Sequence, residues 1–165
     1  MVATFRPLSS QEAGRRGAEA LAAERGGSLG WCGPAAVALA GGTSYAMACA
    51  LLREAAPQRY APEGEIVTAY WRDVVQALAV LGIRAERLPL AAPRPTLLGL
   101  ARRGGLAAGL YLVRVTGHFL LLRLHGFGLA EVHDNRLSGA VLTAHTHGRC
   151  RVTHVARLEN TDPAC

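Results

Sequence analysis

The chain has 165 residues, half of them hydrophobic, which suits one domain with a single hydrophobic core and excludes a disordered chain. Its net charge is +6, but the 18 basic residues are scattered arginines and aromatic residues make up only 5%, so we expect no nucleic-acid interface. No apolar run approaches the roughly 20 residues of a membrane span and residues 1–10 lack a signal-peptide layout, which favours a cytoplasmic protein or one carried inside a virion.

The N-terminal half is dominated by patterns typical of helices. Ser9 or Ser10 can cap a helix from about residue 11 to residue 24, which we assign to an N-terminal helical extension over residues 1–27. Further helices are expected over about residues 32–40, 44–55 and 66–81. A short strand over residues 83–88 and a short helix over residues 97–103 follow them.

The C-terminal half is rich in strand patterns. Short apolar segments separated by turn residues predict strands over about residues 110–115, 118–124, 129–133, 139–143 and 151–158. Helices followed by a run of hairpin strands are typical of an α+β fold, with a helical half packed on an antiparallel sheet. We assign residues 28–165 to this one domain, because no intervening piece is large enough to fold separately.

One cysteine lies where a helix is expected to begin. The segment Gly30-Trp31-Cys32-Gly33-Pro34 precedes an alanine-rich run, and the two glycines are expected to let the backbone turn tightly around the sulfur. Proline suits the first turn of a helix. A helix N-terminus stabilises a thiolate and lowers the pKa of a thiol. Cys32 is therefore the candidate nucleophile, while the other cysteines are expected to be free thiols.

A base and a group to orient it come later in the chain. A nucleophilic thiolate needs a base within hydrogen-bond reach, and the base needs a partner that fixes its ring. His118 begins an apolar strand in the segment Gly117-His118-Phe119, 86 residues after the cysteine. Asp134 and Asn135 end the next strand, 16 and 17 residues further on. We expect His118 to be the base and Asp134, or alternatively Asn135, to orient it.

These motifs, over residues 28–140, resemble the papain-like cysteine peptidases. The most similar members are the compact bacterial and phage versions and the peptidase domains of bacteriocin-processing transporters, which share a Cys-Gly-Pro-Ala helix start, a Gly-His-Phe strand start and a following Asp. The resemblance implies a papain-like fold with a cleft between its two halves. It also implies hydrolysis of a peptide or isopeptide bond in a protein or peptide substrate, through a Cys32–His118–Asp134 triad and an acyl-thioester, without a cofactor.

The oxyanion donor departs from the family pattern. Members usually carry a Gln several residues before the cysteine, but this chain has none between Gln11 and Cys32. Ser28 or the backbone around Gly30 is the candidate substitute. The difference keeps open a catalytically idle domain with a structural or binding role, such as a phage-particle component. A transamidase on the same fold is the other alternative. The sequence carries no signal for the oligomeric state.

A group of residues near the C-terminus has the chemistry of zinc ligands. These are His145, His147, Cys150 and His154. Their spacing matches no standard zinc signature, and two histidines separated by one residue on a strand form an ordinary exposed pattern. We therefore expect no metal site.

Overall fold

The computed structural model describes residues 17–103 and 105–161. Its helices are α1 (Ala18–Glu24), α2 (Cys32–Gly41), α3 (Tyr45–Ala55), α4 (Trp71–Val80), α5 (Leu97–Arg103) and the π-helical segment η1 (Ala144–Gly148). Its strands are β1 (Ile83–Arg87), β2 (Gly109–Val115), β3 (His118–Gly126), β4 (Leu129–His133), β5 (Ser138–Val141) and β6 (Val152–Asn160). All strands pair antiparallel in one sheet of order β1-β6-β2-β3-β4-β5. The predicted α+β class, with helices first and an antiparallel sheet after them, is confirmed.

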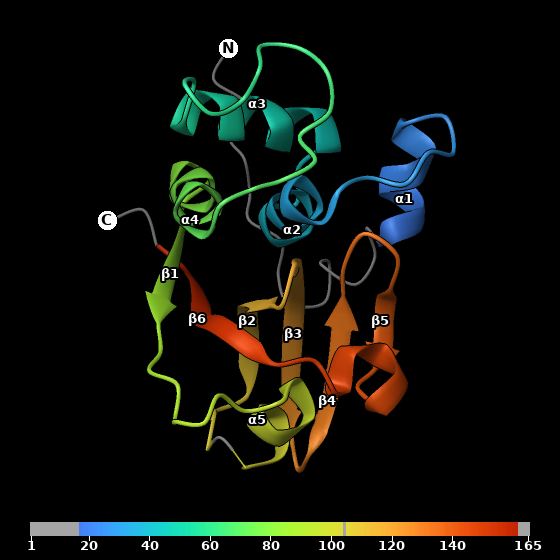
Figure 1. Cartoon of the computed structure of the whole chain (residues 1–165). Helices are drawn as coiled ribbons and strands as arrows, with labels where there is room; N and C mark the ends of the chain where they lie inside the picture. The colour runs from blue at the N-terminus through green and yellow to red at the C-terminus, as the bar shows by residue number, and fades with distance from the viewer. Residues whose placement is uncertain (1–16, 104, 162–165) are drawn as a thin grey trace.

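The sheet has a hydrophobic core on each face. Because successive side chains of a strand point to opposite faces, Leu112 and Leu121 face α2, α3 and α4, whereas Tyr111, Leu120 and Leu122 face α5. Figure 1 shows α2, α3 and α4 grouped together and α5 apart from them, in front of the strands. The two cores fix the central strands β2 and β3, and β3 carries the candidate base at its first residue.

Helix α2 is the centre of the helical layer. Every residue from Gly33 to Gly41 is buried, because alanines and glycines let α3, α4 and β3 approach the helix closely on several sides. The helix ends at Gly42, which adopts the left-handed conformation that favours glycine. Within the described residues, no single helix is long and apolar enough to cross a membrane; α2 and α3 pass that test only as a pair bent by 108°.

The glycines beside Cys32 serve a different purpose from the predicted one. Neither Gly30 nor Gly33 has a positive φ. A Cβ atom on Gly30 would lie 2.4 Å from the ring of Tyr45, and one on Gly33 would lie 2.3 Å from the Cβ of Ala69. These positions therefore need glycine because other parts of the chain pack against them, not because the backbone turns there.

The helix predicted over residues 66–81 begins later than expected, at Trp71. Residues 66–70 form no helix, and Ile66 and Ala69 are buried in the helical core. Tyr70, directly before the helix, is extended, and its backbone N–H donates to the hydroxyl of Tyr60 at 3.2 Å. This tertiary bond, absent from any local pattern, explains the difference.

Helix α1 packs on the rest of the domain. The N–H of Ala18 donates to the Oγ of Ser138 at the start of β5, at 2.8 Å, and Leu21 is buried in the helical core. The expected cap at Ser9 or Ser10 and the first six residues of the predicted helix lie outside the described residues.

A buried carboxylate holds the segment before α4. Asp73 is fully buried and accepts two hydrogen bonds from the Arg59 guanidinium, at 2.9 and 2.7 Å, and one from the Tyr60 hydroxyl at 2.7 Å. Burial alone would raise the pKa of Asp73, but these hydrogen bonds outweigh it and lower the pKa below its ordinary value, so the carboxylate stays ionised. The bonds join α4 to residues 59–60.

Replacing this carboxylate should destabilise the domain. We expect Asp73→Ala to lower the free energy of unfolding by about 1–3 kcal/mol, because the Tyr60 hydroxyl loses its acceptor in a buried place. Urea unfolding measures the change. Gln76→Ala, at an exposed position of the same helix, is the matched control and should change stability by less than about 0.5 kcal/mol. Equal effects of the two substitutions would contradict the role of Asp73.

Candidate active site

The candidate catalytic residues line a cleft between the start of α2 and the strand ends at the β2–β3 turn and after β4. The cleft has a volume of about 490 Å³. Its lining comes from five parts of the chain: Leu29, Gly30, Trp31 and Cys32 around the start of α2; Val67; Gly117 and His118 at the β2–β3 turn; Asp134, Asn135 and Arg136 after β4; and His147 in η1. The structure therefore brings Cys32, His118 and Asp134 to one site from three separate elements.

Cys32 is the first residue of α2, as the sequence predicts, and the loop before it is braced twice. The N–H of Trp31 donates to the Tyr45 hydroxyl at 2.8 Å. The carbonyl of Gly30 accepts from the Nδ2 of Asn135, also at 2.8 Å. Cys32 itself is half-buried at the cleft. These two bonds fix the backbone from which the sulfur projects.

His118 lies between the sulfur and the carboxylate. Its Nε2 is 2.7 Å from the Oδ2 of Asp134, and its interaction with the Cys32 side chain is one of the causes that lower the pKa of that thiol. Since Asp134 occupies Nε2, Nδ1 is the nitrogen left for the sulfur. Asp134 rather than Asn135 is thus the residue beside the imidazole, and the Asn135 amide instead braces the loop before Cys32.

The electrostatics of the pair favour a thiolate and an imidazolium. Burial alone would raise the pKa of Cys32, but hydrogen bonds from His118 and from the Phe119 backbone N–H outweigh it and lower the pKa below 9.0. Burial alone would lower the pKa of His118, but the bonds to Asp134 and Cys32 raise it to about 9. The two shifts in pKa therefore both favour transfer of the proton from the thiol to the imidazole.

Asp134 is held as a carboxylate deep in the site. Its side chain is only 1% exposed, and its Oδ1 accepts from the backbone N–H groups of Arg136 and Leu137, each at 2.7 Å. Burial would raise the pKa of Asp134, but the hydrogen bonds from His118 and the two backbone groups lower it to about 2. The site therefore keeps a fixed negative charge beside the imidazole.

His147 also lines the site and contacts Asp134, and the sequence did not predict its place there. Its Nε2 lies 2.8 Å from the same Oδ2 of Asp134, and its ring stacks on that of His118 with centroids 4.7 Å apart. It belongs to η1, which the strand patterns did not predict. No local signal marks this position, because the contact arises from the packing of η1 beside the loop after β4.

The other candidate zinc ligands are dispersed. His145 is exposed, Cys150 packs beside the second core, and His154 stacks on Trp71 with ring centroids 4.9 Å apart. Of the four, only His147 belongs to a group of potential metal ligands in the described part of the chain, and its partners there are His118 and Asp134.

Backbone N–H groups are the available oxyanion donors. The N–H of Cys32, at the first position of α2, has no partner within the helix. Ser28 is exposed and lies outside the cleft lining, so the proposed side-chain substitute does not reach the site. The Trp31 N–H is already bonded to Tyr45, which leaves the start of α2 as the place where an oxyanion would be stabilised.

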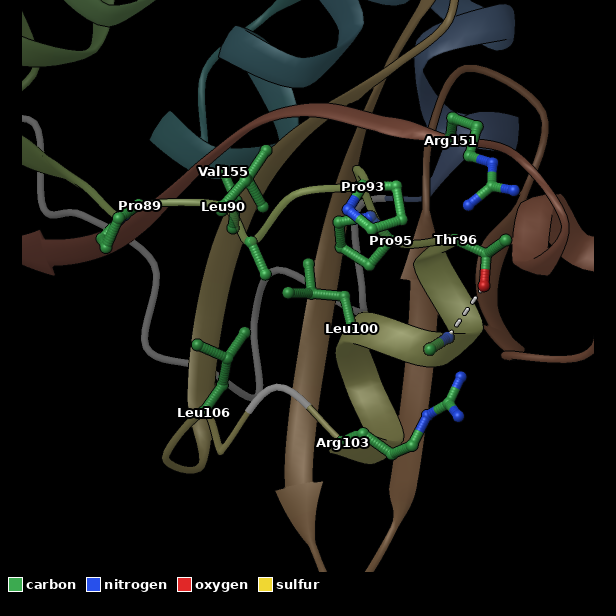
Figure 2. Close-up of a pocket in the computed structure, with 12 residues that line it drawn as sticks. Pro89, Leu90, Pro93, Pro95, Thr96, Leu100, Arg103, Leu106, Arg151 and Val155 are labelled. Carbon is green, nitrogen blue, oxygen red and sulfur yellow. Dashed lines mark hydrogen bonds between the residues drawn. The ribbon is translucent and has the colours of Figure 1, made fainter.

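A larger hollow lies apart from this cleft. Figure 2 shows it between α5, the segment from Pro89 to Pro95 and β6, with a volume of about 670 Å³. Its lining is mostly apolar, with Arg103 and Arg151 as its charged members. No cysteine, histidine or carboxylate lines it, so it offers no pair of nucleophile and base.

The low pKa of Cys32 should depend on His118. The test uses a chain in which Cys49, Cys150 and Cys165 are replaced by Ser, so that iodoacetamide reports on one thiol. We expect His118→Ala to move the midpoint of the rate-against-pH curve upward by about one to three pH units, because the thiolate loses an adjacent positive charge while its burial remains. An unchanged midpoint would contradict the ion pair.

The raised pKa of His118 should depend on Asp134 and not on Asn135. We expect Asp134→Asn to lower this pKa from about 9, because the fixed negative charge beside the imidazolium is lost. Titration of the His118 Cε1 proton by nuclear magnetic resonance measures it. Asn135→Ala removes a neighbouring side chain that does not bond the ring, and should leave the pKa near 9. Equal shifts in both variants would refute this assignment.

Comparisons with protein-family models, with curated proteins and with solved structures found no match to this chain. The family resemblance therefore rests on the three short motifs around Cys32, His118 and Asp134. Independently of any relative, the structure supplies an α+β fold and a cleft in which these three side chains are linked.

Proposed function

We propose that this chain is a papain-like cysteine peptidase that hydrolyses a peptide or isopeptide bond. The observation that carries the proposal is the continuous link from the Cys32 thiol through His118 to the Asp134 carboxylate, along one open cleft. Nucleophile, base and orienting group are the three parts that thiol-based acyl transfer needs.

The proposed reaction starts from the ion pair. The Cys32 thiolate attacks the carbonyl carbon, and the resulting oxyanion lies at the N-terminus of α2, near the Cys32 N–H. The His118 Nδ1 gives its proton to the leaving amine as the C–N bond breaks, which leaves an acyl-thioester. Nδ1 then takes a proton from water, the hydroxide oxygen bonds to the acyl carbon, and the C–S bond breaks to restore the thiolate.

Asp134 supports both halves of this cycle. Its bond to Nε2 keeps the ring oriented with Nδ1 toward the sulfur, and its charge stabilises the imidazolium each time it forms. Two backbone N–H groups also donate to the carboxylate, so it stays ionised and in place while His118 gains and loses its proton.

The cleft suits an extended peptide with an apolar side chain. Leu29, Trp31 and Val67 line it with large exposed fractions of 53%, 41% and 54%. Such exposed apolar side chains around a polar centre are typical of a surface that binds a ligand. An apolar residue of the substrate, next to the scissile bond, would cover these three side chains.

A binding domain without catalysis is the second candidate. It is favoured by the lack of a Gln several residues before Cys32, for which Ser28 does not substitute because it lies outside the cleft lining. Loss of one such donor costs about 2.7–4 kcal/mol of transition-state stabilisation in acyl transfer. A chain of this kind would bind peptides in the cleft and release them uncleaved.

Cleavage of a mixed peptide library, followed by mass spectrometry, tests the proposal. We expect Cys32→Ala and His118→Ala to lose at least about 10³-fold in rate, because they lack the nucleophile and the base. Wild-type kcat/KM should fall above about pH 9, where the imidazolium loses the proton it must deliver. At low pH, kcat/KM should fall as the thiolate is protonated.

Cys150→Ala is the matched control, since it removes a half-buried thiol outside the cleft. Added glycinamide separates hydrolysis from transamidation, because a transamidase would join it to the acyl product. Peptide binding with no cleavage would favour the binding domain, and equal cleavage by wild type and Cys32→Ala would refute the peptidase.

A further inference from the structure

His147 takes no part in the proposed reaction, although its side chain lines the cleft. Its Nε2 and the Nε2 of His118 approach one carboxylate oxygen of Asp134, at 2.8 and 2.7 Å. These three atoms all lie within 4.8 Å of one another. Two imidazole nitrogens and a carboxylate oxygen are a donor set that zinc prefers.

The segment that carries His147 is held in a specific conformation. His147 has a φ of 66°, in the left-handed region that few non-glycine residues adopt. The side chains of Thr143 and Thr146 cap the segment reciprocally. Gly148 is packed so tightly that a Cβ atom would lie 2.2 Å from the Thr143 carbonyl oxygen. The backbone around His147 is thus fixed by packing on both sides of the residue.

We propose that His118, Asp134 and His147 form a binding site for a Zn²⁺ ion, and that the bound ion inhibits the enzyme. The inhibition rests on the proposed peptidase function, whereas the binding does not. His118 and His147 are 21% and 28% exposed, so an ion can enter from the cleft, and the carboxylate behind them supplies negative charge. Water from the cleft would complete the coordination, as in other zinc sites with three protein ligands.

Binding would stop the catalytic cycle at His118. A metal on Nε2 occupies the nitrogen that now bonds Asp134, and the neutral ring then carries its proton on Nδ1. Nδ1 can no longer accept a proton from water, since it already holds one, and releasing that proton would leave an imidazolate. Cys32 is not one of the three potential ligands that lie together here.

Calorimetry with Zn²⁺ tests the site without any activity. The starting protein is the full chain with Cys32→Ser, so that the cleft thiol cannot bind the ion. We expect one Zn²⁺ per chain and at least about 100-fold weaker binding when His147→Asn is added, because a ligand is lost. Asn tolerates the left-handed backbone at this position. His145→Gln, at an exposed position two residues away, should bind as the starting protein does.

Absence of binding to the Cys32→Ser chain, or equal binding after His147→Asn, would overturn the inference. Mg²⁺, which prefers oxygen ligands, should not compete with Zn²⁺ for the site.

Peptide cleavage tests the inhibition. Zn²⁺ should inhibit the wild type, and a chelator should restore its activity. The His147→Asn variant should need a Zn²⁺ concentration at least about 100-fold higher to lose the same fraction of its own zinc-free rate. Equal inhibition of the wild type and of His147→Asn would indicate that the inhibiting ion binds Cys32 instead, and would refute the site. Stoichiometric binding by a chain that cleaves nothing without metal would support the site and refute the peptidase.

Discussion

The buried carboxylate of Asp134 is the interaction on which the site depends. Its two oxygens accept from four N–H groups: those of His118, His147 and the backbone of Arg136 and Leu137. A charge this deeply buried is tolerated only when it is paired and fully hydrogen-bonded. Its contact with His118 also raises the pKa of that ring, and His118 in turn lowers the pKa of Cys32.

The three residues of the site come from different parts of the fold. The sulfur belongs to the helical layer, the imidazole to the central strand β3, and the carboxylate to the loop after β4. Both faces of the sheet are covered by hydrophobic cores, so β3 cannot shift without disturbing one of them. The precision of a three-residue site therefore comes from packing that lies well away from it.

The sequence predicts those parts of the structure that depend on local chemistry. The start of α2 at Cys32, the start of β3 at His118 and the end of β4 before Asp134 all follow from capping, turn and strand signals. The non-helical residues before α4 and the position of His147 do not, because each depends on a contact between segments distant in the chain. The tight turn that the sequence predicts at Gly33 is also wrong, because this glycine is needed for the close approach of Ala69, a contact between distant segments. A single sequence carries little information of this kind.

The bond from Asn135 to the Gly30 carbonyl joins the loop before α2 to the loop after β4. It connects the two layers at the reacting pair while touching neither reacting atom. Val67, on the other side of the cleft, takes no part in this bond. It belongs to the segment between Tyr60 and Asp73, whose two ends are joined by hydrogen bonds of the Tyr60 hydroxyl. In the proposed peptidase, mutations along the exposed residues 61–65 would therefore change this side of the cleft, and with it peptide preference, without touching Cys32 or His118. If the proposed function holds, substrate preference can change during evolution while the reacting residues stay the same.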